Sequence, residues 1–157
     1  MKIVARYFFV LIFFSLISFQ ESSAELLEPN NELKPFDVVK IQLSALKNNN
    51  NPYKNAGIEQ TWEFAHPSNK RFTGPLSRFV QLLNDEGYNI LLNHIEHKIV
   101  EIFKSEKKFI YEVTILDREK NFFKYNWKVE KFANGGPSNN CWLTTSVSSP
   151  IFLGSSI

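Results

Sequence analysis

The spacing of apolar residues along the chain changes once, near His97, from a helical period to a strand period. Before His97, apolar residues recur every three or four positions in three stretches, which is the pattern of helices that bury one face. After it, apolar and polar residues alternate, which is typical of strands with one covered face. We therefore expect an α+β fold, with N-terminal helices packed on one face of a curved antiparallel sheet.

The helical part of the chain predicts three helices. The first begins at Pro35, because proline suits the first turn of a helix, and it ends at the asparagine run of residues 48–51. The second is expected over residues 57–65, before Pro67, and the third begins at Gly74 and Pro75. The apolar faces of the first and third helices comprise Phe36, Val39, Leu43 and Leu46, and Leu76, Phe79, Val80 and Leu83.

The alternating part predicts four strands, over residues 100–103, 108–115, 123–130 and 141–148. The connections at 104–107 and 117–121 are short, which favours antiparallel hairpins because parallel strands need a much longer crossover. Residues 134–140 contain two glycines and a proline and predict a long turn. We expect one domain over residues 34–149, after a flexible leader at 25–33, with residues 150–157 as a C-terminal tail.

The first 24 residues have the three parts of an export signal. Lys2 and Arg6 form a basic start, residues 7–19 are apolar except for two serines, and Ser22 and Ala24 stand at the −3 and −1 positions of a cleavage site. The apolar core is short for a membrane-spanning helix, so cleavage is favoured over an uncleaved signal anchor. The mature chain would begin at Glu25 and act in a periplasm, a thylakoid lumen or the extracellular space.

The charge balance of the mature chain bears on its partners. Removal of Lys2, Arg6 and Glu21 from the 18 basic and 16 acidic residues leaves a net charge of about +1. Nucleic-acid binding needs clustered cations, so nucleic acid is not expected as a partner. Cys141 is the single cysteine, so no intramolecular disulfide can form, and a core position beside Trp142 is favoured over a nucleophilic role.

Acid–base and metal-binding side chains are few in this sequence. His94, Glu96 and His97 form the densest cluster, but a metal needs at least a third well-placed ligand, so neither a metal nor another cofactor is expected. Four residues are candidates for proton transfer: the imidazoles His66 and His94 and the carboxylates Asp85 and Asp117. The carboxylates Asp85 and Asp117 are expected to be exposed, at a helix end and in a hairpin turn.

The segment from His66 to Arg78 is the candidate binding edge, because it places polar groups among phenylalanines. The candidate binding residues in it are His66, Asn69, Arg71, Thr73 and Arg78. The alternative is structural, with Asn69 and Thr73 capping the next helix and Arg78 paired to a carboxylate. On the sheet, the aromatic residues Tyr111, Tyr125, Trp127 and Trp142 either line an apolar pocket or fill it.

The segment of residues 57–79, GIEQTWEFAHPSNKRFTGPLSRF, together with Tyr88 and the Cys141-Trp142 strand, carries a family resemblance. It resembles an uncharacterised group of plastid and cyanobacterial proteins related to the domain-of-unknown-function family numbered 4864. That group is similar to the nuclear transport factor 2 superfamily, over about residues 33–149 here. The resemblance implies a cone-shaped, cystatin-like fold, with helices wrapped by a curved sheet, and implies no particular activity.

Two classes of function remain at this level. The first is an exported, non-enzymatic domain that binds a small apolar molecule or a protein partner, with a homodimer through open sheet faces as a further possibility. The second is a cofactor-independent isomerase or hydrolase with an acid–base residue inside the cone. An enzyme requires a histidine or an aspartate deep in a pocket, whereas a binding domain requires only apolar and aromatic walls.

Overall fold

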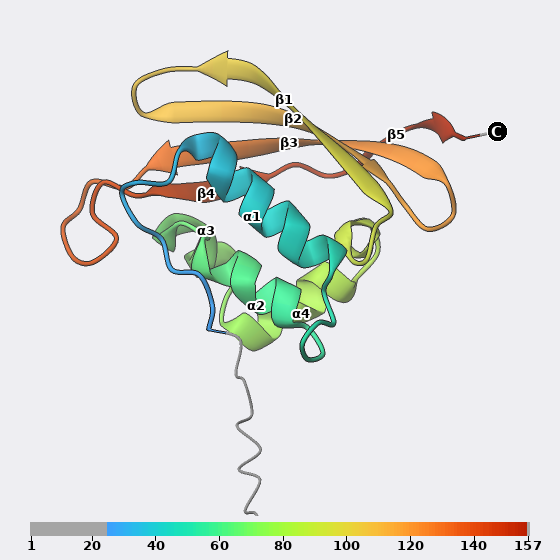
Figure 1. The fold of residues 1–157 in the computed structure, drawn as a ribbon, viewed down its shortest axis with the longest axis horizontal. Helices are drawn as coiled ribbons and strands as arrows, with labels where there is room; N and C mark the ends of the chain where they lie inside the picture. Colours follow the sequence, from blue (N-terminus) through green and yellow to red (C-terminus); the bar gives the residue numbers. More distant parts are fainter. Residues whose placement is uncertain (1–24, 157) are drawn as a thin grey trace, which may run out of the picture.

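The computed structural model describes residues 25–156. The predicted export signal at residues 1–24 lies outside them. Within the described part, four α-helices and a 3₁₀ helix precede a sheet of five antiparallel strands, so the predicted α+β fold is confirmed. The helices lie on one face of the sheet, with α1 directly beneath the strands, α3 against β4, and α2 and α4 farther away (Figure 1).

Helix α1, Pro35–Lys47, begins at the proline, as predicted. Its start is fixed by Asp37, whose carboxylate accepts the Lys34 N–H at 2.9 Å. The residues that face the sheet are fully buried, namely Val38, Val39, Gln42, Leu43 and Leu46. Phe36 differs from the prediction: it is 44% exposed and meets the ring of Tyr111 edge-on at the rim of the core.

Helix α2, Ala56–Glu63, packs closely on the end of α1. At Gly57 a side chain would collide with the carbonyl oxygen of Ala45, so only glycine allows this approach. The buried Asn49 joins the two helices, because its backbone oxygen accepts the Gly57 N–H and its side-chain oxygen accepts the Ile58 N–H. The asparagine run that ends α1 therefore also orients α2.

Two further helices follow, one of which the sequence analysis missed. Helix α3, Pro67–Thr73, occupies a segment expected to be a loop, and none of its residues is buried. A helix without a buried face has no apolar period, which explains why its pattern was not visible. Helix α4, Leu76–Asn84, matches the predicted third helix and buries Phe79 and Leu83. The short helix η1, Asn89–Leu91, then leads into the sheet.

The first three strands form an antiparallel meander: β1, Glu96–Lys104; β2, Lys108–Leu116; and β3, Asn121–Lys131. Pairs such as Tyr111–Trp127 and Val113–Tyr125 face the helices and are buried. The opposite face is polar, with ion pairs between Lys124 and Glu112 at 3.2 Å and between Lys128 and Glu130 at 3.0 Å. The predicted alternation of covered and solvated positions is confirmed in β2 and β3.

Strands β4, Trp142–Val147, and β5, Ile151–Ser155, pair with two different halves of the same edge of β3. Strand β4 pairs with residues 127–131 of β3, and β5 with residues 121–124. The segment expected to be a C-terminal tail therefore contains a strand of the sheet. Its apolar residues are consecutive rather than alternating, so the pattern of a half-buried strand is absent.

The leader before α1 is tied to the domain through Gln60 of α2. The side chain of Gln60 accepts the Leu27 N–H at 2.8 Å and donates to the Leu27 carbonyl at 2.9 Å. None of the helices described for residues 25–156 is both long and apolar enough to cross a membrane.

Candidate functional site

A cavity of about 70 Å³ lies between the helices and the sheet. Helices α1, α2 and α4 supply one wall, and strands β3 and β4 supply the other. Most of the wall is apolar, including Leu46, Ala65, Phe79, Leu83, Leu91 and Trp127. All six of these side chains are buried.

A polar cluster of Gln42, Thr61, Trp127 and Thr144 stands in the inner part of this wall. The Gln42 Oε1 atom accepts two hydrogen bonds, from the Thr144 hydroxyl at 2.6 Å and from the Trp127 indole N–H at 3.0 Å. The Gln42 Nε2 atom donates to the Thr61 carbonyl at 3.0 Å. One carboxamide thereby joins α1, α2, β3 and β4.

The cluster is enclosed, with Gln42 1% exposed and Thr144 2% exposed. Among the described residues, every buried side-chain nitrogen and oxygen has a hydrogen-bond partner. The desolvation cost of burying these groups is therefore offset by hydrogen bonds, and each bond holds a wall residue in one orientation. The cavity is a preformed feature of the core rather than a fault in packing.

The cavity reaches the surface beside α3, where Asn69, Thr73, Leu82, Tyr88 and Val147 are half-buried. Asn69 Nδ2 donates to the Thr144 carbonyl at 3.4 Å, and the Thr73 hydroxyl donates to the Asn69 carbonyl at 2.9 Å. The Tyr88 hydroxyl donates to the Val147 carbonyl at 3.3 Å. The mouth thus combines polar groups with Leu82 and Val147, whereas the interior is mostly apolar.

The predicted binding residues are divided among several places. Trp127, Asn69 and Thr73 line the cavity together. Thr73 and Asn69 belong to α3 itself, so neither caps the following helix, which begins at Leu76 with Pro75 before it. His66 caps α3 by accepting the Ser68 N–H and packs edge-on against Phe132.

The two arginines of the predicted binding edge, Arg71 and Arg78, are exposed and do not line the cavity. Tyr111 and Tyr125 are core residues outside the cavity wall. Burial raises the pKa of the Tyr111 phenol to about 12 and raises the pKa of Tyr125 as well, whose hydroxyl donates to the Gly87 carbonyl at 2.7 Å. The segment from His66 to Arg78 therefore contributes to the site through its inner side only.

His94 and His97 form a hydrogen-bonded pair outside the cavity. His94 Nδ1 lies 2.7 Å from the Leu91 carbonyl oxygen, and His94 Nε2 lies 2.8 Å from His97 Nδ1. His94 precedes β1 in an irregular segment, whereas His97 lies within β1. Within residues 25–156, no group of three or more His, Cys, Asp or Glu side chains could hold a metal ion.

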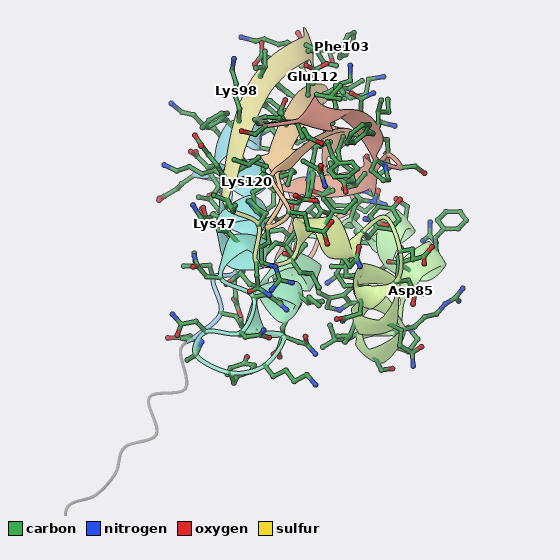
Figure 2. The ribbon with its side chains drawn as sticks, turned by 90° about the vertical axis from the view of Figure 1, so that its right-hand side faces the viewer. Lys47, Asp85, Lys98, Phe103, Glu112 and Lys120 are labelled. Carbon is green, nitrogen blue, oxygen red and sulfur yellow. The ribbon has the colours of Figure 1, made fainter. Side chains whose placement is uncertain are left out.

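The two aspartates considered for proton transfer are also outside the cavity. Asp85 is exposed after α4, well separated from Lys98 and Glu112 of the sheet (Figure 2). Asp117 stands in the β2–β3 turn, where its carboxylate accepts the N–H groups of Glu119 and Asn121. Asp117 therefore stabilises that turn. It was expected to be exposed, but it is half-buried.

Sequence reasoning missed Gln42, Thr61 and Thr144. A signal for Gln42 was present in the sequence. Gln42 stands three residues after Val39, four after Val38 and four before Leu46, so it lies on the buried face of α1. A polar residue on an apolar helix face is informative, since it needs a buried partner. The partners Thr61 and Thr144 belong to distant segments and carry no such signal.

Comparisons with protein-family models, with curated proteins and with solved structures give no match to this chain. The function is therefore argued from the site. No carboxylate, imidazole, thiol or amine belongs to the residues that line the cavity.

Proposed function

We propose that this chain is a non-enzymatic binding domain that holds a small apolar molecule in the cavity between its helices and its sheet. The observation that carries the proposal is the composition of the cavity wall: apolar and aromatic side chains around a few hydrogen-bonded polar groups. Ligand sites are commonly built in this way, with apolar walls for affinity and a few polar groups for orientation.

The volume limits the occupant. At about 70 Å³, the cavity is roughly half the size of an engineered cavity of about 150 Å³ that takes up benzene or xenon. We therefore propose a slender aliphatic molecule, or the end of an aliphatic chain, that enters at the mouth beside the hydroxyl groups of Thr73 and Tyr88. A polar head group would remain at the mouth, and the apolar part would lie against Leu83 and Trp127.

The alternative function is a cofactor-independent isomerase or hydrolase. Such an enzyme needs a titratable group that reaches its substrate, and the cavity wall provides none apart from the Tyr88 phenol, whose hydroxyl is bonded to a backbone carbonyl. The buried histidine, His94, has both ring nitrogens engaged. These observations favour binding over catalysis.

The compartment is part of the proposal and rests on the sequence of residues 1–24. We propose that these residues are removed on export and that the mature domain acts in a periplasm, a thylakoid lumen or the extracellular space. Membership of the cone-shaped nuclear transport factor 2-like proteins is likewise a proposal. It is supported by the order of helices before an antiparallel sheet.

Xenon uptake would test the proposed function, because xenon enters small apolar cavities without specific polar contacts. Amide and indole NMR signals of the protein are recorded under increasing xenon pressure. We expect saturable shifts at the Trp127 indole and at Leu83, and no comparable shifts at Ile102, an exposed residue of β1.

Two variants provide matched controls for this experiment. Leu83→Ala enlarges the cavity and should strengthen xenon binding, whereas Ala65→Leu fills it and should abolish the shifts. Shifts that persist unchanged in folded Ala65→Leu would show that xenon binds elsewhere. An absence of shifts in both the natural protein and Leu83→Ala would contradict the proposal.

A protein partner is the second candidate, because exposed apolar residues stand on two strands at the edges of the sheet. Ile102 of β1 is 52% exposed, and Phe152 of β5 is 59% exposed. Exposed apolar edge strands are sites of strand pairing with other chains. Light scattering over a range of protein concentrations would test the homodimer, and a constant monomer mass would reject it.

A further inference from the structure

The orientation of His94 and His97 follows from the hydrogen bonds they make. A carbonyl oxygen can only accept, so His94 Nδ1 must carry the hydrogen that it shares with Leu91 at 2.7 Å. The other nitrogen of neutral His94 is then a bare acceptor, and His97 Nδ1–H donates to it at 2.8 Å. The chain of donors therefore runs from His97 to His94 to the Leu91 carbonyl.

This chain of hydrogen bonds ends on the cavity wall. The Leu91 side chain is 1% exposed and lines the cavity, while its carbonyl holds His94. Leu46, another wall residue, accepts the Asn93 N–H at 2.8 Å through its carbonyl. The segment of residues 91–94 is thus fixed to β1 by the histidine pair and to α1 by one backbone bond.

Protonation of His97 and protonation of His94 have different effects on the two hydrogen bonds of the pair. A proton on His97 Nε2 leaves both hydrogen bonds intact, because that nitrogen takes part in neither. Once His97 carries hydrogen on both nitrogens, a proton on His94 Nε2 turns the acceptor into a donor that faces the His97 N–H at the same distance. Two donors at 2.8 Å repel, so the rings must separate.

The charges around the pair oppose its protonation. Burial lowers the pKa of His94 to about 4; the hydrogen bond to the Leu91 carbonyl raises it, whereas the neighbouring His97 and the Lys47 ammonium at the end of α1 lower it. Burial and Lys47 also lower the pKa of His97, against the attraction of Glu96. Figure 2 places Lys47 on the same side of the molecule as Lys98 of β1. Helix η1, whose residues are Asn, Ile and Leu, contributes no charge.

We propose that the His94–His97 pair is an acid-operated latch on the cavity: when His94 gains a proton the two rings separate, the segment that carries Leu91 loses its side-chain tie to β1, and an apolar occupant escapes. The inference rests on the proposed function, because the regulated event is occupancy of the same cavity. The latch stays closed at neutral pH and through the first protonation at His97. The latch opens on the second protonation, at His94, when the rings separate.

The latch can be observed without any ligand. Ring ¹⁵N shifts at pH 7 should show hydrogen on Nδ1 of both histidines, and His94 should gain its proton only near pH 4. Hydrogen exchange at Asn93, corrected for its intrinsic rate, should then speed up more than tenfold relative to Val113 in β2. An Nε2–H form of His94 at pH 7, or equal acceleration at both amides, would overturn the inference.

Variants of the histidines separate the latch from general acid effects. His94→Gln retains a donor for the Leu91 carbonyl and cannot gain a proton, so its Asn93 exchange should not respond to acid. His66→Asn provides the matched control, because asparagine also caps helix starts and His66 stands outside the latch. This control should keep the full response at Asn93.

Xenon binding at pH 7 and pH 4 then connects the latch to the cavity. Loss of xenon at pH 4 in the natural protein and in His66→Asn, but not in His94→Gln, supports the inference. Xenon retained at pH 4 while Asn93 exchanges rapidly rejects the latch as a regulator and leaves the proposed function standing. No xenon binding at pH 7, with normal ring shifts, rejects the proposed function itself and with it this regulation.

Discussion

Replacement of Gln42 by leucine tests the central cluster most directly. The carboxamide serves three partners, and its loss would strand two of them: the Thr144 hydroxyl and the Thr61 carbonyl. Trp127 would keep one acceptor, because its indole N–H also lies 3.1 Å from the Thr144 hydroxyl oxygen. The change therefore leaves the Thr144 hydroxyl hydrogen and the Thr61 carbonyl oxygen without a partner in the buried core.

The expected cost follows from these two groups. Each unsatisfied buried group costs about 1 to 3 kcal/mol. The buried leucine side chain gains about 1.5 to 3 kcal/mol through its apolar surface. Two such groups cost about 2 to 6 kcal/mol, so after the gain from the leucine side chain we expect Gln42→Leu to lower the free energy of unfolding by roughly 0.5 to 3 kcal/mol.

Urea unfolding followed by tryptophan fluorescence and circular dichroism measures this difference. With a slope of about 2 kcal/mol per molar urea, the midpoint should fall by roughly 0.3 to 1.5 M. Gln81→Leu in α4 is the matched control, because Gln81 is exposed and the same change should alter stability by less than about 0.5 kcal/mol. Equal effects of the two substitutions would refute the assignment of a structural role to the cluster.

Three further predictions follow from burial, close approach and protonation. Trp127→Ala should cost about 3 to 5 kcal/mol in the same urea assay, since the indole is 1% exposed, and a loss below about 1 kcal/mol would contradict its burial. Gly57→Ala should cost about 1 to 3 kcal/mol, because the added carbon would strike the Ala45 carbonyl, and an unchanged midpoint would disprove that contact. The pKa of His94 is lowered from 6.5 to about 4 in the fold, so its contribution is present above pH 6.5 and is lost as the pH falls toward 4. Natural protein should therefore lose roughly 3 kcal/mol more than His94→Gln over that range, and parallel pH profiles would rule this out.

The elements that the sequence predicted are those with a periodic buried face. Helices α1 and α4 and strands β2 and β3 repeat their apolar residues at helical or alternating intervals, and the change of period near His97 marks the start of β1 at Glu96. Helix α3 and strand β5 lack that signal. The first buries none of its residues, and the second presents three consecutive exposed apolar residues, Ile151, Phe152 and Leu153.

The site was predictable only in part, for a related reason. Trp127 was placed correctly by the alternation of β3, but alternation cannot tell a residue that fills the core from one that borders a cavity. Gln42 and Thr144 are 102 positions apart in the chain, and only the tertiary structure brings the amide to the hydroxyl. Local patterns describe one face of one element, whereas a cavity is formed where several elements meet.

The shared edge of β3 has a consequence for changes at the C-terminus. Because β4 and β5 pair with separate halves of that edge, removal of the residues after Ser149 would leave the β4 pairing at residues 127–131 in place. It would also uncover the backbone of residues 121–124 and one side of Phe123, which packs against Phe152. An uncovered strand edge recruits strands from other molecules, so a shortened chain would be more prone to self-association without first unfolding.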